Sequence, residues 1–313
     1  MIRSIFLLTV LILPLNVHAE KLTLLLDWYM NPSHSPLYVA QKFDFFKKKN
    51  LEIDIVTPTD LQTPSKLVAL GKADLALTYQ YHLHIFVDQG LPLQRIATLI
   101  ETPLNCLAVK ADGPIHKIED LKGKKIGYKV GLGSSKAFIE TLLQDAHLKI
   151  NDVEMIRSSH SMNAGFLAGQ LDAITGLYRN VEPIIMEAEG TQLRLFYYED
   201  HGVPPFDELI VVSNPTKSNP HTLKLFVDAL EEASQYLINH WQECLDAYIK
   251  DHPEQKNETL QKIWQETLPR FALRPGALDI YRYENFAQYL KKADVIKTLP
   301  IIGSYAKDIR AYH

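Results

Sequence analysis

The sequence predicts an α/β protein with two lobes, a cleft between them and a helical C-terminal tail. Short apolar runs alternate with segments of helical periodicity from residue 21 to residue 213, and the alternation starts afresh near Cys106. From Pro220 onward the periodicity is helical throughout. Strands that alternate with helices form βαβ units and mostly parallel sheets, so two such sets predict two sheets.

The first set has expected strands where short apolar or alternating runs occur, at residues 21–26, 51–56, 73–78 and 95–100. The expected helices between them have apolar residues three and four positions apart and lie at residues 37–49, 65–70 and 81–89. Gly71 and Gly90 follow the last two of these helices, and glycine commonly ends a helix.

The second set has expected strands at residues 106–109, 125–128, 153–156, 173–177 and 193–197. Its expected helices lie at residues 118–121, 136–146, 162–168 and 183–188. A strand at 208–213 is expected to cross back toward the first lobe, before tail helices at 223–240, 241–251, 258–268 and 283–293. We therefore expect one lobe from residues 20–105 plus 209–313 and the other from residues 106–208.

Residues 1–19 have the pattern of a cleavable signal peptide. Arg3 supplies the positive charge, residues 5–15 are mostly apolar, and Val17-His18-Ala19 precedes the expected cleavage site. The apolar run is about ten residues, too short to span a hydrocarbon core of about 30 Å as a helix. An uncleaved anchor and a buried first strand are the alternatives. The pattern favours export to the periplasm, and the lack of a cysteine at the cleavage site argues against a lipoprotein.

Charge and cysteine content exclude several classes of protein. The net charge of −4 gives no basic surface for nucleic acid, so no nucleic-acid partner is expected. Cys106 and Cys244 are the only cysteines, too few for a disulfide framework or a Cys-x-x-Cys site. The residues leave two alternatives open, a disulfide between them or two buried thiols.

The loops that follow the expected strands carry the candidate binding residues, because ligands of open α/β sheets bind beyond the carboxyl ends of strands. An aromatic cage with a few carboxylates suits a planar ligand that bears an amine. The alternative is that most of these aromatic rings belong to the cores of the lobes. The aromatic candidates are Trp28, Tyr29, Tyr79, Tyr81, Tyr178 and Phe206. The polar candidates are Asp27, Asn31, His34, Gln80, His82, Glu101, Ser134, Asn180 and Glu208.

A glycine-rich turn at residues 131–135 precedes an expected helix. Its free amides and the hydroxyls of Ser134 and Ser135 suit an anion or a polar group, although a simple helix cap by either serine explains the pattern equally well.

The sequence favours neither a metal site nor an enzyme. His82 and His84 are two positions apart on an expected helix, so they point to different faces. His34, His82 and Glu101 could converge only through the tertiary structure. No nucleophile elbow, Walker loop or His-Glu-x-x-His string occurs, so we expect no metal, no cofactor and no catalysis.

At this point the motifs resemble a known group. Residues 27–40, DWYMNPSHSPLYVA, are similar to the opening motif of the thiamine-pyrimidine group within the type II periplasmic binding proteins. Asp44 and Asn50 stand where this group commonly has glycine or a similar residue. Further similar strings are GKADLA at 71–76, DLKGKKIGY at 120–128 and GQLDA at 169–173, and the likeness spans roughly residues 21–214.

The resemblance implies a monomeric solute-binding protein that delivers a formylaminopyrimidine or hydroxymethylpyrimidine to an ABC importer, touching the membrane only through the permease. It implies that Trp28 and Tyr178 stack on the pyrimidine, while Asp27 and Glu208 accept hydrogen bonds from its exocyclic amine. Other residues placed nearby by the resemblance are Asn31, His82 and Glu101.

The same group resembles a fungal-type pyrimidine synthase that consumes pyridoxal phosphate and its own histidine and needs iron. His82 lies where that histidine would be. Thr78, however, replaces the lysine expected to hold pyridoxal phosphate, and a threonine cannot form a Schiff base. The synthase's CCCFC string is also missing. A third possibility, a sulfonate or other small-acid binder, would need cations in the cleft, where only Lys129, Lys136 and Arg179 are candidates.

Overall fold

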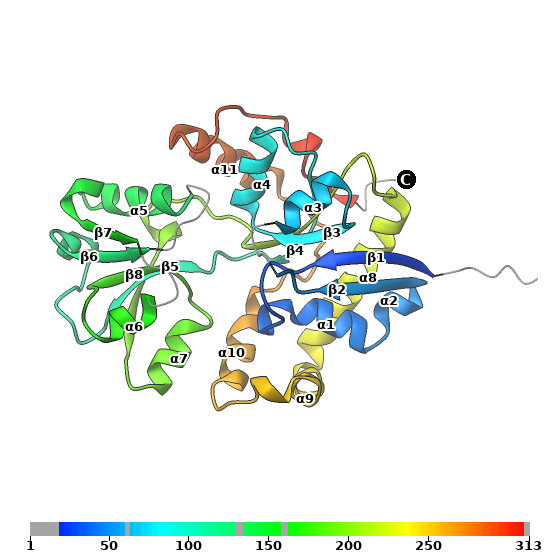
Figure 1. Ribbon diagram of the computed structural model, residues 1–313, viewed down its shortest axis with the longest axis horizontal. Helices are drawn as coiled ribbons and strands as arrows, with labels where there is room; N and C mark the ends of the chain where they lie inside the picture. The colour runs from blue at the N-terminus through cyan, green and yellow to red at the C-terminus, as the bar shows by residue number, and fades with distance from the viewer. Residues whose placement is uncertain (1–18, 60–62, 129–133, 158–161, 310–313) are drawn as a thin grey trace, which may run out of the picture.

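The computed structural model in Figure 1 has two mixed sheets, and each sheet with its covering helices forms a lobe. The structure describes residues 19–59, 63–128, 134–157 and 162–309. The predicted signal peptide, apart from Ala19, lies outside the described residues. Within the described ranges, no helix is both long and apolar enough to cross a membrane.

The first sheet has the strand order β2-β1-β3-β10-β4. β1 pairs in parallel with β2 and β3, whereas β10 lies antiparallel between β3 and β4. The strand expected near residues 208–213 therefore returns to the first sheet, as predicted. The bounds are β1 Glu20–Leu25, β2 Leu51–Val56, β3 Leu75–Thr78, β4 Gln94–Ile100 and β10 Leu209–Ser213.

The second sheet repeats this plan in the order β7-β6-β8-β5-β9, with β5 antiparallel to both β8 and β9. Each sheet is thus mixed, with one strand running against the others. The bounds are β5 Asn105–Lys110, β6 Lys125–Tyr128, β7 Glu154–Arg157, β8 Ala173–Tyr178 and β9 Leu193–Tyr197.

The central strands of the first sheet are apolar on both faces because helices cover both. Along β10, Leu209 and Val211 join one core cluster while Ile210 and Val212 join the other, as alternation along a strand requires. Figure 1 shows α1, α2 and α8 over one face and α3 and α4 over the other. The first-lobe helices are α1 Ser35–Lys42, α2 Phe45–Lys48, α3 Pro64–Leu70 and α4 Gln80–Asp88. The tail helices are α8 Pro220–Asn239, α9 Trp241–Asp251, α10 Leu260–Thr267 and α11 Ile280–Lys292.

The single helix expected over residues 37–49 is wrong, because the chain forms α1 and α2 with a break between them. Asp44 has φ of +61° and Asn50 has φ of +56°, so both adopt the left-handed conformation that favours glycine. This conformation agrees with the glycine or similar residue that the resemblance implies at these two places. The helix expected at 118–121 is a 3-10 turn, Ile118–Leu121. The second-lobe helices are α5 Ser134–Asp145, α6 Met162–Leu167 and α7 Glu182–Ala188.

Two crossover segments join the sheets, residues 101–104 between β4 and β5 and residues 198–208 between β9 and β10. An apolar contact lies beside them. Phe138 of α5 packs against Phe206 and Phe286, with ring centroids 5.5 and 6.2 Å away, so one core cluster continues from lobe to lobe. Cys106 and Cys244 are free and buried, which decides against a disulfide between them.

Candidate functional site

Asp27 follows β1, and its carboxylate accepts two side-chain hydrogen bonds. Its Oδ2 accepts a hydrogen bond from the Tyr79 hydroxyl at 2.6 Å, and its Oδ1 accepts one from His34 Nε2 at 2.9 Å. Burial acts to raise the pKa of Asp27, but the bonds from His34 and Tyr79 outweigh it and hold the pKa below its usual value. The side chain is therefore an ionised acceptor inside the protein.

The loop after Asp27 is organised to present His34. Asn31 Oδ1 accepts from the backbone N–H of Ser33 at 2.9 Å, which caps the 3-10 turn Pro32–His34. The Asn31 backbone N–H points at His34 Nδ1 at 3.3 Å, so this nitrogen accepts and Nε2 carries the proton donated to Asp27. Asn31 and His34 hence orient Asp27 in this structure.

A hydrogen-bond chain through tyrosines connects the two lobes. Tyr178, at the end of β8 in the second lobe, donates to the Tyr79 hydroxyl at 3.1 Å, and Tyr79 donates to Asp27. Tyr79 also stacks on Tyr81, with centroids 5.2 Å apart and planes within 2°. Burial raises the pKa of all three tyrosines well above 10, so their hydroxyls remain protonated donors.

Glu208 lies at the end of the second crossover, with only 1% of its surface exposed. Its Oε2 accepts from the backbone N–H of Leu104 at 2.6 Å, and its Oε1 accepts from Asn105 Nδ2 at 2.9 Å. Burial raises the pKa of Glu208 to about 7, against the opposing effect of these bonds. Burial, and next the Glu208 charge, raise the pKa values of Tyr81 and Tyr178, so Glu208 lies near both tyrosines.

The tyrosine–carboxylate cluster is the name we use below for Asp27, Tyr79, Tyr81, Tyr178 and Glu208. His82 borders it, with its ring edge-on to Tyr79 at 5.2 Å and to Tyr81 at 4.6 Å. Burial lowers the pKa of His82 to about 4, so the ring is neutral near pH 7.

His84 points away from the cluster, as the two-residue spacing predicts. It is buried and hydrogen-bonds the Tyr305 hydroxyl at 2.9 Å. His34, His82 and Glu101 do not converge, because each has different neighbours. Within the described part of the chain, no group of three or more His, Cys, Asp or Glu side chains could hold a metal ion.

Trp28 and Asn180 differ in their exposure to solvent. Trp28 is 53% exposed, and its ring meets the Tyr29 ring in a T-shaped arrangement with centroids 5.6 Å apart. Asn180 is fully buried and its Nδ2 donates to Thr267 Oγ1 in α10 at 2.8 Å. Its Oδ1 is a buried acceptor with no hydrogen-bond donor among the described residues.

Several predicted residues lie elsewhere. Phe206 is core, 1% exposed among other phenylalanines. Ser134 and Ser135 begin α5, but their side chains and the turn at 131–133 fall outside the described residues. Glu101 lines a separate cavity of about 320 Å³ with Thr98, Asp207, Arg274 and Arg282.

Sequence reasoning missed the partners that hold these groups. Thr267 bonds Asn180 from a helix 87 residues away, and Asn105 bonds Glu208 from 103 residues away. Neither residue stands in a motif, so no local signal could have identified it.

The two mixed sheets and the two crossovers define the type II periplasmic binding protein fold. The aliphatic sulphonate binding protein SsuA from Escherichia coli has this fold, with a TM-score of 0.73, 15% identity, and coverage of 90% of this chain and 96% of that one. At this identity the likeness shows the fold alone.

The chain belongs to the NMT1/THI5-like family, which matches residues 31–244. A Haemophilus influenzae protein named for thiamine biosynthesis is 38% identical over 93% of this chain and 92% of its own length. The formylaminopyrimidine-binding protein of Halalkalibacterium halodurans is 29% identical over 80% of this chain and 76% of its own. A 4-amino-5-hydroxymethyl-2-methylpyrimidine phosphate synthase from Legionella pneumophila is 27% identical over 81% and 80%.

Proposed function

We propose that this protein is a solute-binding protein that captures a thiamine-precursor pyrimidine, of the formylaminopyrimidine or hydroxymethylpyrimidine type, for an ABC importer. Residues 1–19 would direct it to the periplasm, and the mature chain would then begin at Glu20. Cell fractionation tests the location, and N-terminal sequencing tests cleavage. Protein that stays in the cytoplasm and begins at Met1 would contradict the predicted export.

The observation that carries the proposal is the hydrogen-bond chain from Tyr178 through Tyr79 to Asp27, which crosses between the lobes beside Glu208. This chain brings the tyrosine rings together with the buried carboxylate of Asp27, which is a hydrogen-bond acceptor. A 4-aminopyrimidine is flat, donates from its exocyclic amine and accepts at its ring nitrogens. Such a ligand would stack on the exposed face of Trp28 and meet carboxylates at its edge.

Glu208 suits the edge of an aminopyrimidine. Because burial raises its pKa to about 7, the carboxyl group is close to half protonated near neutral pH. The acid form can donate to a ring nitrogen while its other oxygen accepts from the amine. The Oδ1 of Asn180, a buried acceptor without a donor among the described residues, is available as a further acceptor.

The synthase alternative rests on the position of His82 beside the cluster and on the synthase relatives. Thr78 is 4% exposed within β3 and has no amine to hold pyridoxal phosphate, which weighs against this reading. Yellow colour or bound iron in the purified protein would favour it.

A sulfonate binder would need a free cation, and the chemistry of Arg179 argues against that role. Its guanidinium is paired with Glu199 at 2.6 and 2.9 Å and lies 3.8 Å from the centroid of the Tyr197 ring. Lys136 is exposed and pairs with Glu140 on the same helix. Lys129 lies outside the described residues.

A ligand panel tests the proposal directly. Thermal shift and calorimetry with formylaminopyrimidine, hydroxymethylpyrimidine, thiamine and taurine should show stabilisation by a pyrimidine precursor and none by taurine. A ligand at 100 times its dissociation constant adds about 2.7 kcal/mol to the free energy of unfolding. If no pyrimidine stabilises the protein, the proposed function is wrong.

Trp28→Ala is expected to weaken pyrimidine binding by about 5- to 150-fold, because base stacking on an aromatic side chain contributes about 1–3 kcal/mol. Calorimetry of the variant measures the loss. Tyr281→Ala is the matched control, since this aromatic side chain is 70% exposed on α11 and should leave affinity unchanged. Equal affinities in both variants would remove Trp28 from the site.

A further inference from the structure

We infer that Arg282 is a positioning residue that limits how far the two lobes separate, by holding both crossover segments together. Arg282 lies on α11, in the tail, and touches none of the residues of the tyrosine–carboxylate cluster by any hydrogen bond or ion pair found among the described residues. The effect on ligand affinity rests on the proposed function, whereas the effect on lobe separation does not.

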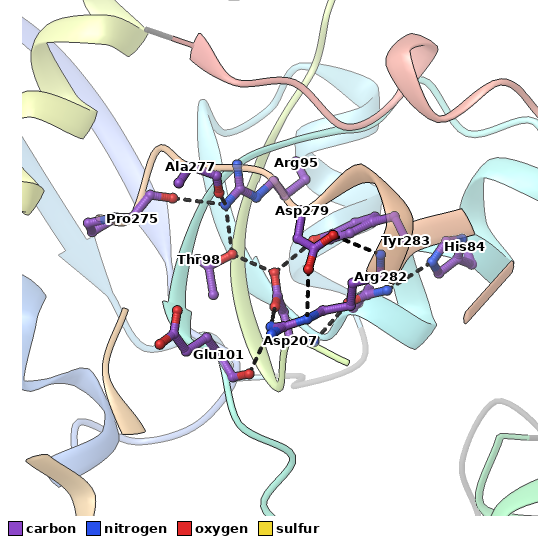
Figure 2. Close-up of polar contacts among 11 residues, drawn as sticks. His84, Arg95, Thr98, Glu101, Asp207, Pro275, Ala277, Asp279, Arg282 and Tyr283 are labelled. Atoms are coloured by element: carbon purple, nitrogen blue, oxygen red, sulfur yellow. Dashed lines mark hydrogen bonds and ion pairs between the residues drawn. The ribbon is translucent and has the colours of Figure 1, made fainter. Parts of the chain in front are cut away.

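One guanidinium nitrogen bridges the two crossovers. Arg282 Nη1 donates to the backbone oxygen of Glu101 at 2.9 Å and to Asp207 Oδ1 at 2.5 Å (Figure 2). Glu101 begins the first crossover and Asp207 lies at the end of the second. These two segments are the chain connections between the sheets. They meet where β4 and β10 pair, at Ile100 and Leu209, and the Arg282 side chain adds a bridge between them just beyond that pair.

The Asp207 end of this bridge is rigid. The carboxylate is buried, and its Oδ2 accepts from Thr98 Oγ1 of β4 at 2.7 Å and from the Tyr283 hydroxyl at 3.3 Å. Its backbone N–H donates to Gln80 Oε1 at 2.7 Å, at the start of α4. Arg95 Nη2 donates to that Thr98 hydroxyl at 2.8 Å, as Figure 2 shows. Asp207 is thereby anchored to β4, α4 and α11 at once.

The neighbouring residue ties the same crossovers a second time. Glu208 accepts from the backbone N–H groups of Leu104 and Asn105, at the far end of the first crossover. The two consecutive carboxylates, Asp207 and Glu208, have separate sets of partners. Glu208 belongs to the candidate ligand site, whereas Asp207 pairs with Arg282. A ligand that engages Glu208 is therefore one residue from the bridge.

The bridge exists here together with contacts between the lobes. Besides the bond between Tyr178 and Tyr79, Lys262 of α10 pairs with Glu187 of α7 at 2.6 Å. Domain closure occurs through a few connecting residues that absorb changes in backbone angle. Loss of the Arg282 bridge leaves the first crossover freer to change angle, so the lobes should separate more often. A ligand that needs both lobes then binds more weakly in proportion to the smaller competent fraction.

The test measures lobe separation without ligand. Spin labels at Glu189→Cys, after α7, and Glu258→Cys, before α10, occupy exposed positions on the two lobes, while the native cysteines are buried. Double electron–electron resonance of the full chain should give a longer and broader distance distribution for Arg282→Met than for the parent. Arg274→Met, which removes the other arginine of the same cavity, should leave the distribution unchanged.

Affinity for hydroxymethylpyrimidine provides the second measurement. We expect Arg282→Met to weaken this affinity about tenfold. Arg282→Lys keeps the charge and one donor, so its affinity should lie between those of the parent and of Arg282→Met. Arg282→Lys also covers the case in which the methionine variant folds poorly. An unchanged ligand-free distance distribution in both Arg282 variants overturns the inference. A lengthened distribution in a protein that binds no pyrimidine would uphold it while rejecting the proposed function.

Discussion

Asp27→Ala is expected to lower the free energy of unfolding by about 2–6 kcal/mol, because two donors lose their acceptor. The Nε2–H of His34 and the hydroxyl of Tyr79 are both directed at this carboxylate, at 2.9 and 2.6 Å. A buried donor without a partner costs about 1–3 kcal/mol. Urea denaturation monitored by circular dichroism measures the change. The loss is a large fraction of the 5–15 kcal/mol typical of a domain.

Two variants make this prediction specific. Asp27→Asn keeps one carbonyl oxygen and should lose less stability than Asp27→Ala, although its amide group now faces one of the donors. Asp112→Ala removes an exposed aspartate and should cost almost nothing. If Asp27→Ala unfolds at the same urea concentration as the parent, the hydrogen bonds to Asp27 do not hold the loop. A folded Asp27→Ala protein that still binds a pyrimidine tightly would remove Asp27 from the ligand site.

Glu208→Gln is expected to become more stable relative to the parent as pH rises from about 5 to 8. The folded protein raises the pKa of Glu208 from 4.5 to about 7, mainly by burial, so folding favours the protonated acid. The stabilisation from that carboxyl is complete below pH 4.5 and is lost as pH rises through 7. The shift of about 2.5 pKa units corresponds to about 3 kcal/mol. Glutamine cannot ionise, and it keeps a carbonyl oxygen for the N–H of Leu104.

The difference in free energy of unfolding between the parent and Glu208→Gln reports the ionisation of Glu208 alone, because the other titrating groups are present in both proteins. Burial lowers the pKa of His82 to about 4 and that of His84 to about 3. Stability from these neutral imidazoles is present above pH 6.5 and is lost as pH falls toward those values. Both proteins contain these histidines, so their effect cancels in the comparison. Urea unfolding at four pH values between 5 and 8 gives the difference. Parallel profiles for parent and variant would show that Glu208 has an ordinary pKa.

The positions of the candidate residues along the chain could be predicted, because they follow from local patterns. Asp27 and Tyr178 each stand where an expected strand ends, one in each sheet, and ligands of open α/β sheets bind beyond such ends. In the structure, the Tyr79 hydroxyl links the two residues: it accepts a hydrogen bond from Tyr178 and donates one to Asp27. The local pattern did not separate Glu101 from the residues of the cluster. Glu101 also follows a strand, β4, but it lines the cavity beside Arg282.

The sequence by itself determined the α/β class, the strand that returns to the first sheet and the strings that place the chain in its family. These depend on hydrophobic periodicity and on motifs a few residues long. Only the tertiary structure decided which polar groups meet. The Tyr178–Tyr79 bond joins residues 99 apart, and the Arg282–Asp207 pair joins residues 75 apart. Such contacts depend on how two sheets and a tail helix pack together, and no local pattern encodes that packing.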